Sequence, residues 1–401
     1  MVVQLSEDLP LAPEPTARTV RGLLDRARAF PELADKYRGL DGRTGHVELG
    51  DIPPLTADEL RAALWSGIRS GLAIGTGTSL YFVGGTGARP SPALVPTDLF
   101  APLIVRDWRP LGPQDILLNL CQPSRLWPVH DLVNALAREQ GASIIPFGGL
   151  HSGNLLQWLD VLSGCGVTAL AGDTPVIREL ARLCLHTGQS MDWLRTVVWV
   201  GSGRDTTAAE LAARAFPSAR IWSLYGSVDA WAVGAGGPEC PRGVFHPLAH
   251  QHIEIVDGEI LVTTLDERAV SPLLRYRSGD TGEFIICPCR SHAPAIRLSG
   301  HLEDVLSFRG ARFSRAEIVD LARSLDDVDD AEAVMVDSGL PTERLQLRVR
   351  MAAGVLVDRY QNEWIRECLL GNHLGLGRIA AEAPESVEVV AVAGLLEQLH
   401  A

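Results

Sequence analysis

The chain has 401 residues, of which 46% are hydrophobic and 21% are charged, and its formal net charge is -13. This composition is typical of a globular protein and excludes a long disordered one. The negative charge repels nucleic acid and anionic membranes at long range, so we expect neither as a partner. The sequence contains no run of about 18 apolar residues and no secretory signal pattern, so we expect a cytoplasmic protein.

The first 70 residues are predicted to form helices and connections. Thr56-Ala57-Asp58-Glu59 is a capping box, which predicts a helix that continues to about Arg69. A glycine-rich stretch follows at 71–87 and encloses an apolar run at 80–83. This run predicts a strand that leads into a loop.

Strand and helix patterns alternate between residues 115 and 203. We expect strands at 116–120, 142–146, 168–171 and 196–200, and helices at 129–140, at 155–163 and from Pro175. Such alternation indicates a parallel, helix-covered sheet. Short strands with turns follow from about 244 to 298, which indicates antiparallel structure, and a small α+β unit begins after Gly300.

The predicted fold is therefore α/β. It has a large N-terminal domain with helix-covered, mainly parallel sheets and an antiparallel β subdomain, and a small α+β C-terminal domain. We place the first domain at 1–302, with its β subdomain at about 216–300, and the second at 303–401.

Three segments carry residues that suit a nucleotide site. The first is Gly84-Gly85-Thr86-Gly87, where glycines let backbone N–H groups approach phosphate oxygens and Thr86 adds a hydroxyl. In the second, Tyr225-Gly226-Ser227-Val228-Asp229, the ring suits a base and the carboxylate suits a cation. In the third, Asp280 follows a glycine turn and can accept hydrogen bonds from ribose hydroxyls. Each segment alone is equally well explained as a surface turn.

The order of these segments is more specific than any one of them. They are followed by Arg297-Leu298-Ser299-Gly300-His301-Leu302-Glu303-Asp304 and then by Phe308-Arg309-Gly310. The series resembles the phenylacetate–coenzyme A ligase-like branch of the acyl-adenylate-forming (AMP-binding) superfamily. The stretch from Tyr225 to Asp229 looks like members of the phenazine-tailoring type.

The resemblance implies a role for each segment. Thr86 and Asp229 would act in catalysis, with Mg²⁺ on Asp229, and Asp280 would bind the ribose. Glu303 or Asp304 would lie at the hinge of a mobile C-terminal domain. The residues expected to bind ATP are Gly84, Gly85, Thr86, Gly87, Tyr225, Gly226, Ser227, Asp229, Asp280 and Arg297.

The resemblance also implies a reaction. We expect ATP-dependent activation of a small aromatic or heteroaromatic carboxylic acid as its acyl adenylate. The acyl group would pass to coenzyme A, to the phosphopantetheine of a carrier protein, or to a partner reductase or acyltransferase. A homodimer is one option for the assembly.

The sequence departs from the family pattern at several positions. The family carries a lysine near its C-terminus that contacts the reacting oxygens, whereas this sequence has no lysine after Lys36. Loss of one preorganised charge costs on the order of 10²–10³ in rate. Adenylation would then be slow, or Arg378 would substitute for the lysine. Two alternatives remain, a catalytically impaired protein that binds nucleotide or acyl adenylate, and an ATP-independent acyltransferase.

Four side chains in the antiparallel region suit a metal ion. The seven cysteines form an odd set in a chain expected to be reduced, which argues against a disulfide framework. Cys240, His246, Cys287 and Cys289 supply the ligands of a closed tetrahedral Zn²⁺ site, and similar pairs recur in the resembled branch. The alternatives are His292 as a ligand, or reduced side chains that bind no metal.

Overall fold

A computed structural model gives the fold. The described residues are 15–40, 47–72, 77–83, 91–123, 128–149, 155–201, 203, 205–227, 229–302, 305–308, 311–337, 343–352, 355 and 358–392. The chain divides into two compact units, residues 1–299 and residues 300–400. Each unit is described by itself below.

The helices of the described residues have the following bounds: α1 Ala17–Arg28, α2 Pro31–Tyr37, α3 Ala57–Arg69, α4 Ala101–Asp107, α5 Val129–Glu139, α6 Leu155–Gly164, α7 Thr174–Thr187, α8 Thr206–Ala215, α9 Arg315–Arg323, α10 Arg359–Asn372 and α11 Leu374–Glu382. Short 3-10 turns lie at Arg38–Leu40, Leu49–Asp51 and Pro384–Ser386. No described helix is long and apolar enough to cross a membrane.

The strands of the first unit are β1 Thr78–Val83, β2 Ser91–Pro96, β3 Ile116–Asn119, β4 Ser143–Ile145, β5 Ala169–Asp173, β6 Thr196–Val200, β7 Arg220–Ser227, β8 Trp231–Gly236, β9 Val244–Pro247, β10 Gln251–Val256, β11 Glu259–Thr264, β12 Tyr276–Ile286 and β13 Pro294–His301. Eleven of them form one sheet in the order β10-β11-β12-β13-β9-β8-β7-β6-β5-β3-β4. β1 and β2 form a separate antiparallel hairpin.

The large sheet is parallel at one end and antiparallel at the other. β4, β3, β5, β6 and β7 pair in parallel, and the pairings from β7 to β8 and from β8 to β9 are antiparallel. The predicted α/β fold, with parallel helix-covered strands and an antiparallel part, is confirmed. The antiparallel strands belong to the same sheet as the parallel ones. Strand β7 joins the two parts, because it pairs in parallel with β6 and antiparallel with β8.

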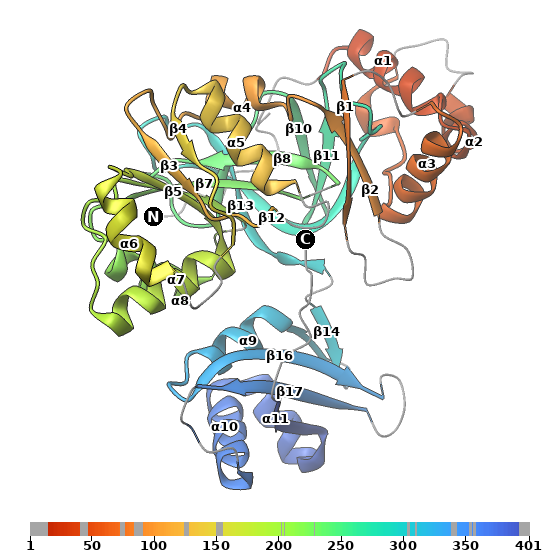
Figure 1. The fold of residues 1–401 in the computed structure, drawn as a ribbon. Coiled ribbons are helices and arrows are strands. Elements are labelled where there is room, and N and C mark those ends of the chain that lie inside the picture. The colour runs from red at the N-terminus through yellow and green to blue at the C-terminus, as the bar shows by residue number, and fades with distance from the viewer. Residues whose placement is uncertain are drawn as a thin grey trace. The chain divides into compact units, whose positions relative to one another are not determined.

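Two apolar layers cover the parallel strands. α4 and α5 contribute to the core on one face, and α6, α7 and α8 contribute to the core on the other face (Figure 1). β5 and β6 are therefore buried on both faces, as expected for parallel strands covered by helices. The N-terminal helices α1, α2 and α3 share a third core with the curled antiparallel end of the sheet.

The second unit is a small α+β layer structure. Its strands are β14 Val305–Phe308, β15 Ala311–Ser314, β16 Val328–Val336, β17 Arg344–Met351 and β18 Val387–Ala391. Residues of β17 alternate between a buried apolar face and a face with arginines, as in a sheet covered on one side. Leu345, Leu347 and Val349 of β17 pack with α9, α10 and α11 in one core.

Candidate functional site

The predicted ribose ligand Asp280 lies against the predicted adenine neighbour Tyr225. The Tyr225 hydroxyl donates a hydrogen bond to Asp280 Oδ2 at 2.5 Å. The Tyr225 ring is 3% exposed and packs against the ring of Phe245, with 5.2 Å between centroids. Burial raises the pKa of Tyr225 well above its ordinary value, and the Asp280 charge raises it further. Tyr225 is therefore a neutral donor that holds one oxygen of the carboxylate.

A second tyrosine–aspartate pair joins the same two segments, with the tyrosine and the aspartate now on the other segment in each case. The Tyr276 hydroxyl donates to Asp229 Oδ2 at 2.9 Å. Asp229 Oδ1 is buried and has no hydrogen-bond partner. Burial raises the pKa of Asp229, while the hydrogen bond from Tyr276 and the positive charge of Arg61 lower it. A buried carboxylate oxygen without a partner is costly unless something else satisfies it, so this atom is a candidate ligand atom.

These two pairs depend on the curvature of the sheet. β7 and β12 are separated in the sheet order by β8, β9 and β13. Their side chains nevertheless share one core, which includes Tyr225, Tyr276 and Ile296. The sheet must therefore curl at its antiparallel end, and this curl brings residues about 50 positions apart into contact.

Close contacts constrain the backbone of the segment from Tyr225 to Asp229. A Cβ on Gly226 would lie 1.9 Å from the carbonyl oxygen of Trp231, so glycine is required there. Ser227 Oγ accepts the Ala230 N–H at 3.0 Å and so closes the β7–β8 turn. Gly226 and Ser227, expected as nucleotide contacts, thus have clear structural roles in this hairpin. Their contact with a nucleotide stays a prediction.

The other predicted site residues lie apart from these pairs or outside the described residues. Arg297 of β13 forms an ion pair with Glu283 at 2.8 Å, and both side chains are exposed. Gly84, Gly85, Thr86 and Gly87 lie outside the described residues, as do Glu303 and Asp304. The side chain of Arg378 is likewise not described. Their roles stay predictions.

The strands that flank the glycine segment are described. Val83 at the end of β1 pairs with Ser91 at the start of β2. The ring of Phe82 lies 5.6 Å from the ring of Trp65 on α3. The described strands on either side of the glycine segment, β1 and β2, therefore lie beside α3.

Sequence reasoning missed two residues of this site. Tyr276 lies four residues before Asp280, and its aromatic character was the available signal. Arg61 lies on α3, and the capping box predicted that helix without predicting which of its residues would approach Asp229.

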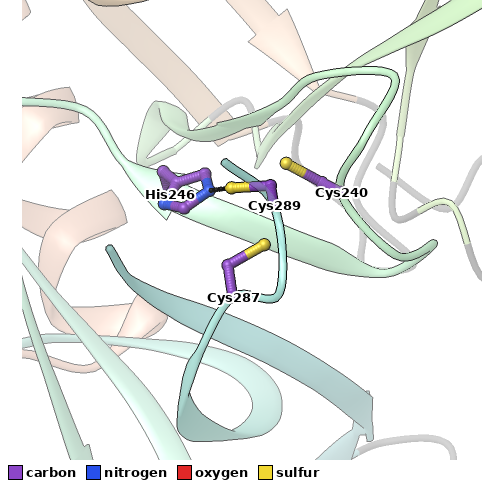
Figure 2. A group of neighbouring side chains, drawn as sticks. All are labelled: Cys240, His246, Cys287 and Cys289. Carbon is purple, nitrogen blue, oxygen red and sulfur yellow. Dashed lines mark hydrogen bonds between the residues drawn. The ribbon is translucent and has the colours of Figure 1, made fainter. Parts of the chain in front are cut away.

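The four predicted metal ligands come together at the edge of the antiparallel strands (Figure 2). The ligand atoms of Cys240, His246, Cys287 and Cys289 all lie within 4.8 Å of one another. His246 Nδ1 is 3.0 Å from the carbonyl oxygen of Pro294, which leaves Nε2 toward the sulfur atoms. A backbone carbonyl on the far ring nitrogen is the usual way in which a metal-binding histidine is oriented.

The chemistry of the set fits a soft, tetrahedral ion. Zn–S bonds of about 2.3 Å place sulfur ligands roughly 3.8 Å apart, within the observed spread. A hydrogen bond with Cys240 raises the pKa of His246 to about 9. Burial raises the pKa of Cys289, but hydrogen bonds from Ser291, Cys287 and His246 bring it down to about 6. Cys289 thus favours the thiolate, whereas burial raises the pKa of Cys287 to about 12.

The sequence was compared with protein families and with curated proteins. No protein-family model matches the sequence. Indoleacetate–lysine synthetase of Pseudomonas savastanoi is 24% identical over 170 residues, which are 42% of this chain and 42% of that protein. The chain therefore aligns with less than half of the length of this curated relative.

Solved structures match over more of the chain. 2-Hydroxyisobutyryl-CoA ligase, in the postadenylation state with 2-HIB-AMP, has a TM-score of 0.69 at 18% identity, over 98% of this chain and 93% of that one. The chain has the fold of acyl-adenylate-forming ligases. ATP-bound MatB of Rhodopseudomonas palustris has a TM-score of 0.59 at 16% identity, over 79% and 64%. A variant of the amide bond synthetase Mcba of Marinactinospora thermotolerans has a TM-score of 0.57 at 18% identity, over 80% and 66%.

Proposed function

We propose that the chain activates a small carboxylic acid with ATP as its acyl adenylate. The observation that carries this proposal is a pair of hydrogen bonds between two segments of the chain, from Tyr225 to Asp280 and from Tyr276 to Asp229. It holds two carboxylates with different surroundings in one place, within a fold shared with adenylate-forming ligases. Proteins that share a fold can catalyse different reactions, so the side chains of the site are what support this reaction.

The two carboxylates suit two different tasks. Asp280 has one oxygen held by a neutral phenol, which orients the carboxylate to accept hydrogen bonds from the ribose hydroxyls. Asp229 presents a buried oxygen without a partner, and such an atom suits a hard divalent cation. Mg²⁺ bound there would neutralise charge on the ATP phosphates. Tyr276 would fix the direction of that oxygen.

The chemistry is a displacement at phosphorus. A carboxylate oxygen of the acid attacks the α-phosphorus of ATP, the bond to the bridging oxygen breaks, and pyrophosphate leaves with the electron pair. The product is an acyl adenylate. The protein contributes position and electrostatics, which for phosphoryl-type transfers are the main sources of rate.

The acid is proposed to be aromatic or heteroaromatic. The curated relative carries indoleacetate in its name, and the Tyr225 to Asp229 stretch resembles the phenazine-tailoring type. We propose as well that the chain belongs to the phenylacetate–coenzyme A ligase-like branch. The acceptor would be coenzyme A, a carrier thiol, or an amine supplied through a partner enzyme.

We also propose that the Cys240–His246–Cys287–Cys289 cluster binds a structural Zn²⁺. All four positions are filled by protein ligands, so no position is open for a substrate. The proposed ion would connect His246 of β9 to Cys287 and Cys289 in the turn between β12 and β13. It would hold the fold rather than take part in adenylation.

ATP–pyrophosphate exchange tests the proposed activity. The wild-type chain and Asp280→Asn are assayed with a panel of aryl, heteroaryl and aliphatic acids, and each protein is checked for folding by circular dichroism. We expect label in ATP with an aromatic acid and a loss of roughly 10²-fold or more in Asp280→Asn. Absence of exchange with every acid, together with measurable ATP binding, would favour the alternative of an impaired nucleotide-binding protein, which the missing C-terminal lysine also favours.

A further inference from the structure

Helix α3 is tied by its start to the strand that carries the third motif. Leu55 donates its N–H to the Arg275 carbonyl at 3.1 Å and accepts the Arg277 N–H at 2.9 Å. Leu55 therefore lies opposite Tyr276, the residue that holds Asp229. The helix begins two residues later, with Thr56 as its cap. The first turns of α3 are thus fixed relative to Asp229.

The same helix reaches the base of the glycine segment. Trp65 contacts Phe82, with ring centroids 5.6 Å apart, and Phe82 is the next to last residue of β1. Arg61, Trp65 and Arg69 follow one another at intervals of four residues, so they share one face of the helix. All three line a groove of about 290 Å³, together with Ala62 and the acidic residues Glu32 and Asp58.

Arg61 is the residue of this face that approaches Asp229. Its positive charge lowers the pKa of both Asp229 and Tyr276, so the guanidinium lies within electrostatic reach of this pair. Arg61 Nε is buried and has no hydrogen-bond partner. The ion pair of Arg61 with Asp58 involves an Asp58 side chain that is 88% exposed, and such surface pairs stabilise little.

Two buried atoms therefore lack hydrogen-bond partners, a donor on Arg61 and an acceptor on Asp229, and they belong to residues within electrostatic reach of each other. A ligand that fits between them must accept hydrogen bonds from the guanidinium and must tolerate a carboxylate, directly or through a cation. A polyphosphate does both, because its oxygens accept from arginine in pairs and also bind divalent cations.

We propose that Arg61 contacts the β- and γ-phosphates of the nucleotide and holds the departing pyrophosphate. This inference rests on the proposed function, since it takes Asp280 as the ribose end and Asp229 as the phosphate end of one site. Arg61 of helix α3 would then supply the positive charge that adenylation needs. Lys36, the single lysine of the sequence, is already bonded to Glu59 Oε2 at 2.5 Å and to the Pro54 carbonyl at 2.7 Å.

The test is a series of ligands with increasing numbers of phosphates. Calorimetry measures the Kd of AMP, ADP, ATP and pyrophosphate with the wild-type chain and with Arg61→Ala, Arg61→Lys and Asp58→Asn. We expect Arg61→Ala to weaken ATP and pyrophosphate by roughly tenfold to a hundredfold and AMP by less than about threefold. Arg61→Lys should recover part of the loss, because a point charge replaces a bidentate donor. Asp58→Asn removes a negative charge beside Arg61 and should therefore bind ATP and pyrophosphate at least as tightly as the wild type does.

A matched control separates charge from position. Arg21→Ala removes an exposed arginine of the neighbouring helix α1 and should leave every Kd unchanged. Equal weakening of AMP and ATP in Arg61→Ala would mean a structural role for Arg61 and would overturn the inference. If the wild-type chain binds ATP and Arg61→Ala binds it equally tightly, the inference is overturned as well, while the proposed function still stands. A wild-type chain that binds no nucleotide refutes the proposed function itself.

Discussion

Removing the hydroxyl of Tyr225 isolates the contact on which the site depends. In Tyr225→Phe the ring keeps its packing against Phe245, so no cavity opens, and the change is confined to the 2.5 Å hydrogen bond with Asp280. A hydrogen bond to a charged group contributes about 1.5–3 kcal/mol. We therefore expect the free energy of unfolding near pH 7 to fall by about 2 kcal/mol.

The pH dependence of this loss follows from the raised pKa of Tyr225. The folded state favours the neutral phenol, because burial and the Asp280 carboxylate oppose its ionisation. The stabilisation is therefore fully present below the pKa of an unfolded tyrosine, about 10, and declines above it. Above pH 10 the wild-type chain should lose up to about 1.4 kcal/mol per pH unit relative to Tyr225→Phe.

Urea unfolding of both proteins from pH 7 to 11 measures this difference directly. Tyr81→Phe is the control, since the Tyr81 hydroxyl donates to Asp131 at 3.2 Å across an exposed contact. We expect this control to change the free energy of unfolding by less than about 1 kcal/mol at pH 7. A difference between the wild type and Tyr225→Phe that is below about 0.5 kcal/mol, or that stays constant through pH 11, would refute the buried Tyr225–Asp280 contact.

Three further changes test other parts of the structure. Cys287→Ser should abolish the one zinc ion per chain that mass spectrometry is expected to detect and should lower the melting temperature by roughly 5 °C or more; a metal-free wild type would contradict the zinc proposal. Gly226→Ala should destabilise by about 1–3 kcal/mol, since its Cβ would lie 1.9 Å from a backbone oxygen, whereas Gly22→Ala in open space on α1 should not, as measured by denaturant unfolding. His250 is buried without partners and burial lowers its pKa to about 4, so the wild type should lose up to about 3 kcal/mol relative to His250→Phe as the pH falls from about 6.5 to 4; parallel acid titrations of the two proteins would contradict this.

Local patterns predicted most of the first unit. The strand expected at 196–200 is β6 with the same bounds, and the short strands expected from about 244 to 298 include β10 and β11. The capping box at Thr56 predicted the start of α3 correctly, because this cap is formed by residues three positions apart, Thr56 and Glu59. Such features depend on neighbours in the sequence, so the sequence is sufficient to predict them.

The contacts of the site could be predicted only in part. The chemistry of Cys240, His246, Cys287 and Cys289 pointed to one cluster, and the four side chains do lie together. The pairing of Tyr276 with Asp229 was not foreseen, since it depends on how strongly the sheet curls between β7 and β12. Sheet curvature is a property of all the strands together, and no local periodicity encodes it.

Strand β12 connects the predicted ribose ligand Asp280 to the cysteine cluster, so the cluster can affect the position of Asp280. Asp280 stands near the start of β12, and Cys287 follows directly after the end of the strand at Ile286. Seven residues of extended chain span roughly 23 Å, so an ion at the cluster is too distant to contact a nucleotide at Asp280. It can still act on that residue by fixing the far end of β12 against β9, where His246 lies. Tyr225 and Leu55 contact the start of β12 and the cluster lies just beyond its other end, so contacts at both ends of the strand fix the position of Asp280.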